Sequence, residues 1–100
     1  MSTQTADVLD AARDLLDRDG WRQGIRPRSA KDNDRRRDML VAVATADHAN
    51  GGLHFIDAIE ALSAVTGGGR VDVWNDTPGR RTSEVLDAFT AAAAHERGRG

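Results

Sequence analysis

The 100-residue sequence contains no cysteine, which excludes disulfide bonds, thiolate metal ligands and a cysteine nucleophile. Its longest unbroken apolar run, Met39–Ala44, is far shorter than a membrane-spanning helix. Residues 1–19 are polar and acidic, so we expect no secretory signal peptide there. These absences lead us to expect a cytoplasmic protein that makes no membrane contact.

Net charge is also small, at −2, which argues against non-specific nucleic-acid binding. The charge is uneven, however, because residues 20–38 carry seven basic and three acidic side chains, whereas residues 39–69 carry three acidic side chains only. The basic stretch could bind phosphates, or it could be a solvated loop that pairs with the acidic face of the preceding helix.

The composition, with 39% apolar and 30% charged residues, is typical of a globular protein, and the length fits one domain. We therefore expect a single helical domain over residues 1–100, with frayed ends at 1–4 and 97–100. Apolar residues recur at helical spacing in four segments, which predict helices at about 6–19, 34–48, 54–66 and 83–95. The stripes expected to be buried in the first and last helices are Val8, Leu9, Ala12, Leu15 and Leu16, and Val85, Leu86, Phe89, Ala92 and Ala93. The predicted fold class is all-α: a compact bundle of about four short helices, with a long basic loop after the first.

Local signals mark the ends of the first and last of these helices. Thr5 and Thr82 are candidate N-caps, because a threonine hydroxyl can accept a free backbone N–H of the first turn. Gly20 stands where a helix commonly ends on a left-handed residue. Gly67–Gly69 should end the third helix, and we expect residues 70–81 to be irregular, with a turn at residues 76–79.

The two middle helices are predicted from different patterns. Residues 39–46 are apolar on nearly all sides, which predicts a helix enclosed in the core, although a short strand over residues 40–43 would also fit. In the third helix, one apolar stripe predicts the buried face: it consists of Phe55, Ile59, Leu62 and Thr66, with Ile56 beside it.

Two short motifs resemble an uncharacterised family of small proteins from actinobacteria and their phages. Before the last helix, the chain reads Trp-Asn-Asp, two residues, then Gly-Arg, over residues 74–80. After the first helix it reads Gly-Trp-x-Gln-Gly, over residues 20–24. Residues 40–44 depart from the family's Cys-Ala-x-Gly-Ala stretch, so any role tied to that cysteine is absent here. The resemblance implies fold and lineage, but no activity.

The Trp-Asn-Asp motif has two interpretations. In the structural one, Trp74 packs into the core, Asn75 and Asp76 bond local backbone, Gly79 takes a positive φ, and Arg80 pairs with an acid. In the other, Trp74, Asp76 and Arg80 form a recognition surface, since Trp and Arg are frequent in binding hot spots. Trp21 has the same two interpretations, and in the structural one it folds back onto the first helix and packs on the core, where it could also contact Trp74. The candidate binding surface comprises Trp21, Gln23, Arg35, Arg36, Arg37, Trp74, Asn75, Asp76 and Arg80.

Catalytic and metal-binding patterns are absent from the sequence. The three histidines are scattered, and no Ser-His-Asp arrangement or carboxylate pair stands out, so we expect no enzyme activity, cofactor or metal. The leading hypothesis is a small non-enzymatic protein that binds a cellular protein, with a homodimer left open. The alternative is a DNA-binding regulatory module that uses residues 22–37.

Overall fold

The computed structural model describes residues 3–24 and 35–98, and within these ranges the regular structure is helical apart from one isolated bridge. The predicted all-α class is therefore confirmed, and the strand alternative for residues 40–43 is wrong because they lie inside a helix. The helices in the described ranges are α1 (Thr3–Asp19), α2 (Met39–Ala49), α3 (Phe55–Val65), α4 (Val71–Asn75) and α5 (Thr82–Gly98).

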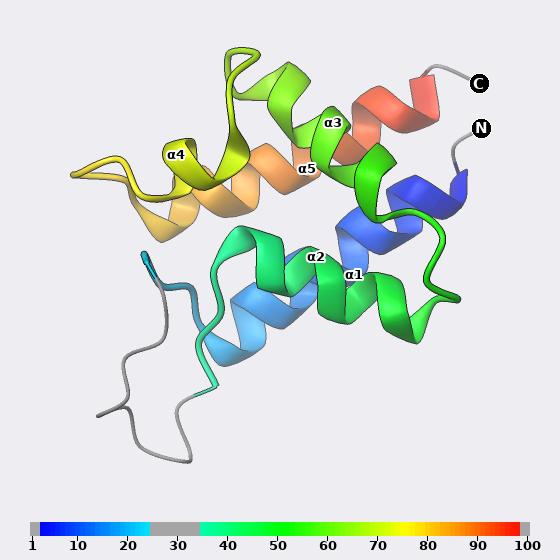
Figure 1. Ribbon diagram of the computed structural model, residues 1–100, viewed down its shortest axis with the longest axis horizontal. Helices are drawn as coiled ribbons and strands as arrows, with labels where there is room; N and C mark the ends of the chain where they lie inside the picture. Colours follow the sequence, from blue (N-terminus) through cyan, green and yellow to red (C-terminus); the bar gives the residue numbers. More distant parts are fainter. Residues whose placement is uncertain (1–2, 25–34, 99–100) are drawn as a thin grey trace.

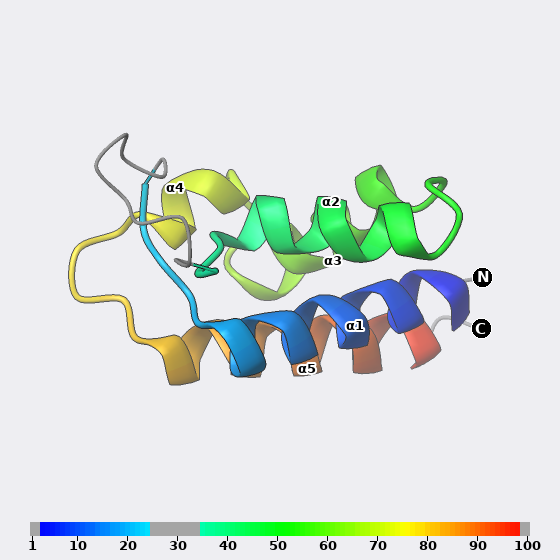
Figure 2. The same cartoon turned by 90° about the horizontal axis from the view of Figure 1, so that it is seen from below.

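The helices form two layers (Figures 1 and 2). Helices α1 and α5 lie side by side and antiparallel in one layer, and α2 and α3 lie over them, with α4 at one end of this second layer. Arg97, near the end of α5, donates to Asp7 and Asp10 on α1 at 3.3 and 2.6 Å, which ties the two long helices together. In the described chain, no helix combines the length and apolarity needed to cross a membrane.

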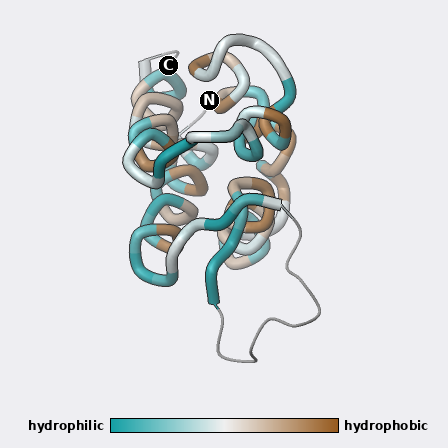
Figure 3. The backbone as a smooth tube through the Cα atoms, turned by 90° about the vertical axis from the view of Figure 1, so that its left-hand side faces the viewer, coloured by the Kyte–Doolittle hydropathy of each residue, from teal (hydrophilic) through white to brown (hydrophobic). Residues whose placement is uncertain are grey.

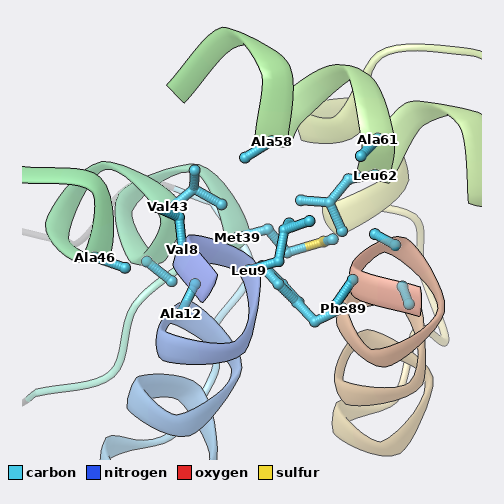
Figure 4. Close-up of a cluster of buried hydrophobic side chains, with 14 of the residues drawn as sticks. Val8, Leu9, Ala12, Met39, Val43, Ala46, Ala58, Ala61, Leu62 and Phe89 are labelled. Atoms are coloured by element: carbon cyan, nitrogen blue, oxygen red, sulfur yellow. The ribbon is translucent and has the colours of Figure 1, made fainter. Parts of the chain in front are cut away.

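The core lies between the two layers and receives side chains from every helix (Figure 4). Its largest fully buried residues include Leu9 and Leu16 from α1, Met39 from α2, Leu62 from α3 and Phe89 from α5. Alanines fill much of the remaining core, which lets the backbones of neighbouring helices approach closely. The predicted apolar stripes of α1 and α5 supply their buried faces, apart from Leu15 and Leu86, which are only partly buried.

The second layer differs from the sequence prediction in which residues it buries. Helix α2 is not enclosed: Val41 is 48% exposed, and Ala44 and Thr45 also face solvent. In α3, the buried face is centred on Ala58, Ala61 and Leu62 rather than on the predicted stripe, whose Phe55, Ile59 and Thr66 are only half-buried. Leu62 belongs to the predicted stripe and is fully buried, so the observed face is the predicted one rotated toward Ala58 and Ala61.

Helix boundaries also differ from the predictions. Helix α2 begins at Met39 and not near residue 34, because the Asp38 carboxylate accepts the Val41 N–H at 2.7 Å and caps the helix. Residue 34 itself lies outside the described ranges. Thr5 is buried within α1 and does not cap it. At the start of α5, the cap interaction comes from Glu84, whose carboxylate accepts the Arg81 N–H at 2.7 Å.

The ends of the chain are more helical than predicted. Helices α1 and α5 extend to Thr3 and Gly98, so part of each segment expected to fray is helical. Of the predicted loop over residues 20–38, the described parts, 20–24 and 35–38, are non-helical, and 25–34 lie outside the described residues.

Candidate functional site

The two sequence motifs, more than 50 residues apart, meet at one end of the bundle. The segment after α1 leaves at Gly20, which has a φ of +97° and donates its N–H to the Leu16 carbonyl at 2.9 Å. This segment then runs past the end of α4, where the second motif lies (Figure 1). We call the hydrogen-bonded contact between residues 21–24 and 75–77 the motif junction. Figure 3 looks onto this end of the molecule, where the chain is largely hydrophilic.

Asn75 is the centre of the motif junction. Its side chain is buried, with 2% exposure, and both of its polar atoms bond to other segments. The Oδ1 atom accepts the Trp21 indole N–H at 2.6 Å and the Met39 backbone N–H at 3.1 Å. The Nδ2 group donates to the Arg22 carbonyl at 3.3 Å and to the Asp76 carboxylate at 2.9 Å. One amide therefore links the ends of α1 and α4 to the start of α2.

Gln23 and Gly24 extend the same contact along the second motif. The Gln23 amide donates to the Asn75 carbonyl at 3.1 Å and to the Thr77 carbonyl at 2.7 Å. The Gly24 N–H donates to the Asp76 carboxylate at 2.7 Å. The prediction that Asn75 and Asp76 bond local backbone is therefore wrong, since apart from the bond between their own side chains both bind the remote 21–24 segment or α2.

Trp74 and Arg80 form a second set of contacts beside the motif junction. The Arg80 guanidinium stacks over the indole ring, 3.7 Å from its centroid, and Nε donates to the Trp74 carbonyl at 3.1 Å. A third interaction joins Arg80 to Glu84 at 3.5 Å, so the predicted pairing with an acid is confirmed. Only 17% of the Arg80 side chain is exposed, which makes it part of the packing rather than a free cation.

The turn between α4 and α5 follows its predicted chemistry, shifted by one residue. The Arg80 N–H donates to the Thr77 carbonyl at 3.1 Å, so the turn comprises residues 77–80. Gly79 has a φ of +85° at its third position, as a type II turn requires. The predicted positive φ of Gly79 is confirmed.

An isolated bridge between Trp21 and Arg37 joins the segment after α1 to the segment before α2. The Arg37 N–H donates to the Gly20 carbonyl, and the Arg22 N–H donates to the Arg37 carbonyl, each at 3.0 Å. The Arg37 guanidinium also donates to the Asp19 carboxylate at 2.6 Å, and Arg18 donates to the same group at 2.8 and 3.0 Å. These bonds, first from Arg18 and then from Arg37, hold the pKa of Asp19 well below its usual range.

A small polar recess lies between the start of α2 and the end of α4. It has a volume of about 20 Å³, enough for a water molecule, and it is lined by Asp38, Leu40, Asp72, Asn75 and Asp76. Its three carboxylates already have partners: Asp38 caps α2, Asp72 pairs with Arg70 at 2.7 Å, and Asp76 accepts two bonds in the motif junction. Across residues 3–24 and 35–98, no three His, Asp or Glu side chains are grouped so as to hold a metal ion.

The structure brings together most, but not all, of the candidate binding residues. Trp21 and Trp74 are partly buried and packed on the core, as the structural interpretation predicts. Arg35 and Arg36 are exposed, and the Arg36 side chain lies so close to Gly20 that an added Cβ there would be 2.8 Å from it. The members with side-chain bonds or stacking at this end are Trp21, Gln23, Arg37, Trp74, Asn75, Asp76 and Arg80.

Sequence reasoning missed two features of the surface and the site. The Arg37–Asp19 pair agrees with the expectation that the basic stretch could pair with the preceding helix, but the sequence did not identify Asp19, which also accepts from Arg18, as the acceptor. It also missed the exposed apolar side chains of the second layer. A signal for these was available, because two large apolar residues, Leu53 and Ile56, lie outside the stripe expected to be buried.

Taken together, the fold and the motif junction define a small two-layer helical protein whose opposite chain segments are joined at one end by a buried amide. Among known protein families, one described as a family of unknown function (DUF6197) matches residues 1–95 of this chain. The chain therefore belongs to this family. Neither the search of curated proteins nor the search of solved structures finds a match.

Proposed function

We propose that this protein is a non-enzymatic interaction protein that acts in the cytoplasm by binding another protein through its second helical layer. The motif junction is a structural element in this proposal, because its polar atoms bind one another. As the sequence resemblance implies, we propose an actinobacterial or actinobacteriophage origin, with a host protein or a second copy of this chain as partner.

The observation that carries the proposal is the distribution of exposed apolar side chains. Among the described residues, the large apolar side chains that face solvent are Val41 on α2, Leu53 before α3, Ile56 on α3 and Val73 on α4. All four belong to the second layer, and the α1–α5 layer contributes none of them. Large apolar side chains that are exposed in one layer and not in the other favour a protein-binding surface on that layer, because burying them in a complex is favourable.

Affinity capture from the encoding organism tests the proposal directly. We expect a protein to co-purify with the tagged wild-type chain and to be lost with the Leu53→Ser/Ile56→Ser variant. The matched control is Ala91→Ser/Ala94→Ser, which changes two exposed residues of α5 and should leave the capture unchanged. All three proteins should have similar melting temperatures, since the changed side chains are exposed. Equal capture by wild type and the Leu53/Ile56 variant would refute the proposal.

If the partner is a second copy of the chain, the protein should form a homodimer through the same layer. Light scattering on the purified protein measures its mass in solution. A dimer that becomes a monomer with Ile56→Ser would identify the chain itself as the partner.

The DNA-binding alternative depends on residues 22–37, most of which lie outside the described residues. Within the described part, Arg37 is engaged with Asp19, which leaves fewer free cations for phosphate contacts. A gel shift at physiological ionic strength tests this alternative. Sequence-selective binding that is lost with Arg35→Ala/Arg36→Ala would favour it over protein binding.

A further inference from the structure

The outer face of α3 combines apolar and acidic side chains. Leu53 and Ile56 are the most exposed large apolar residues in the described chain, at 82% and 67%. Ile56 lies one helical turn from Glu60, on the side of α3 opposite the buried Ala58 and Leu62. Asp57 is also exposed and adjoins them.

The acidic side chains on this face have no ion-pair partner among the described residues, which is also true of Asp17 and Asp87. Within the described residues, neither Asp57 nor Glu60 has an ion-pair partner, whereas Asp10 pairs with Arg97 and Glu84 with Arg80. The segment from residue 39 to residue 69, which contains both α2 and α3, has no lysine or arginine at all. The negative charge beside the exposed apolar residues is therefore uncompensated by neighbouring cations in the sequence.

The negative charge on this face favours some kinds of partner over others. Phosphate groups of nucleic acids or of anionic membranes would be repelled by Asp57 and Glu60. A protein that buries Ile56 and has cations at the edge of the contact would instead gain electrostatic complementarity. Ala64, one turn after Glu60 on α3, is small and exposed, which leaves room for a helix to approach closely.

We propose that this face binds an amphipathic helix of the partner protein, whose apolar stripe is flanked by arginine or lysine. The inference rests on the proposed function and adds the chemistry of the partner. The apolar stripe would cover Leu53 and Ile56, while the flanking cations would lie against Asp57 and Glu60.

Two labelled peptides provide the test, measured by fluorescence anisotropy with the full chain. Each has about 18 residues, long enough to form a helix on binding, and the same leucine stripe. One has arginines beside the stripe and the other has glutamates. We expect the arginine peptide to bind about tenfold more tightly or better, and this preference to shrink as salt rises from about 0.05 to about 0.2 M.

Variants separate the two contributions. Ile56→Ser should weaken binding of the arginine peptide by about fivefold or more, because the apolar contact is lost. Asp57→Asn/Glu60→Gln should remove the preference for arginine and keep the melting temperature, since both residues are exposed. The matched control, Asp17→Asn/Asp87→Asn, neutralises two exposed acids on α1 and α5 and should keep the preference.

Three results would overturn the inference: no binding of the arginine peptide, equal binding of both peptides, or an equal loss of preference in the control variant. These results leave the proposed function standing if capture of a protein still depends on Leu53 and Ile56. Failure of that capture removes the proposed function itself, so the two failures are distinguishable.

Discussion

Replacing Asn75 with alanine tests whether one buried amide holds the two motifs together. The substitution removes the four hydrogen bonds of this side chain and leaves the Trp21 indole N–H, the Met39 N–H and the Arg22 carbonyl without their partner. The Met39 N–H is buried, so water cannot readily replace the lost oxygen. The other two groups are partly buried and can be rehydrated in part.

The expected loss of stability follows from how deeply each of these groups is buried. A buried donor without a partner costs about 1–3 kcal/mol, and each partly buried hydrogen bond contributes about 0.5–1 kcal/mol. We therefore expect Asn75→Ala to lower the free energy of unfolding by about 2–5 kcal/mol. Urea denaturation followed by circular dichroism measures this loss, and it should appear as a lower midpoint with an unchanged slope.

Two further variants make the result specific. Asn50→Ala is the matched control, because its exposed side chain donates only to the Ala46 carbonyl, so the loss should stay below about 1 kcal/mol. Asn75→Asp keeps the accepting oxygen, but it places a second acceptor against the Arg22 carbonyl and the Asp76 carboxylate. It should be at least as destabilising as Asn75→Ala. If both Asn75 variants unfold at the wild-type urea concentration, the motif junction does not stabilise the fold and the reasoning fails.

Three other perturbations test the packing, the stacked arginine and the ion pairs. Phe89→Ala should lower the free energy of unfolding by about 3–5 kcal/mol, because the ring is fully buried between the layers; a loss under about 1 kcal/mol in urea would show that the face is wrongly assigned. Arg80→Ala should cost about 1–2 kcal/mol through its stacking and hydrogen bond, whereas its exposed neighbour variant Arg81→Ala should change the midpoint little; equal midpoints would contradict the packing role. Asp19 has a lowered pKa, so its carboxylate stabilises the fold above the ordinary carboxyl pKa of about 4, and this contribution is lost as the pH falls below it. The stability gap between wild type and Asp19→Asn should therefore be largest at neutral pH and narrow in acid, and a gap independent of pH would count against the ion pairs.

Sequence reasoning was most reliable where the signal is local. The spacing of Val8, Leu9, Ala12, Leu15 and Leu16 predicted the buried face of α1, because a helix repeats its faces every 3.6 residues, and all but Leu15 are buried. The positive φ of Gly79 was also predictable, since few other residues adopt that conformation in a turn. In contrast, α4 has only five residues, too few to show a helical period.

Longer-range features of the site were less predictable. The sequence marks residues 20–24 and 74–80 as unusual, but turn chemistry explains Asn75 and Asp76 equally well by local bonds. Their actual partners, including Trp21 and Gly24, are more than 50 positions away in the chain. Spacing within a motif contains no information about which remote donor will lie beside its acceptor.

The sequence alone determined the helical class, the faces of the two long helices and the tight turn, because these depend on residues within a few positions of one another. Only the tertiary structure decided that Asn75 would be buried among Trp21, Arg22 and Met39, and that Ile56 would face solvent. Burial depends on how helices pack against one another, and a short apolar helix such as α3 can turn either its alanines or its larger side chains to the core. In this chain α3 buries Ala58, Ala61 and Leu62 together, which leaves Ile56 on the opposite side of the helix.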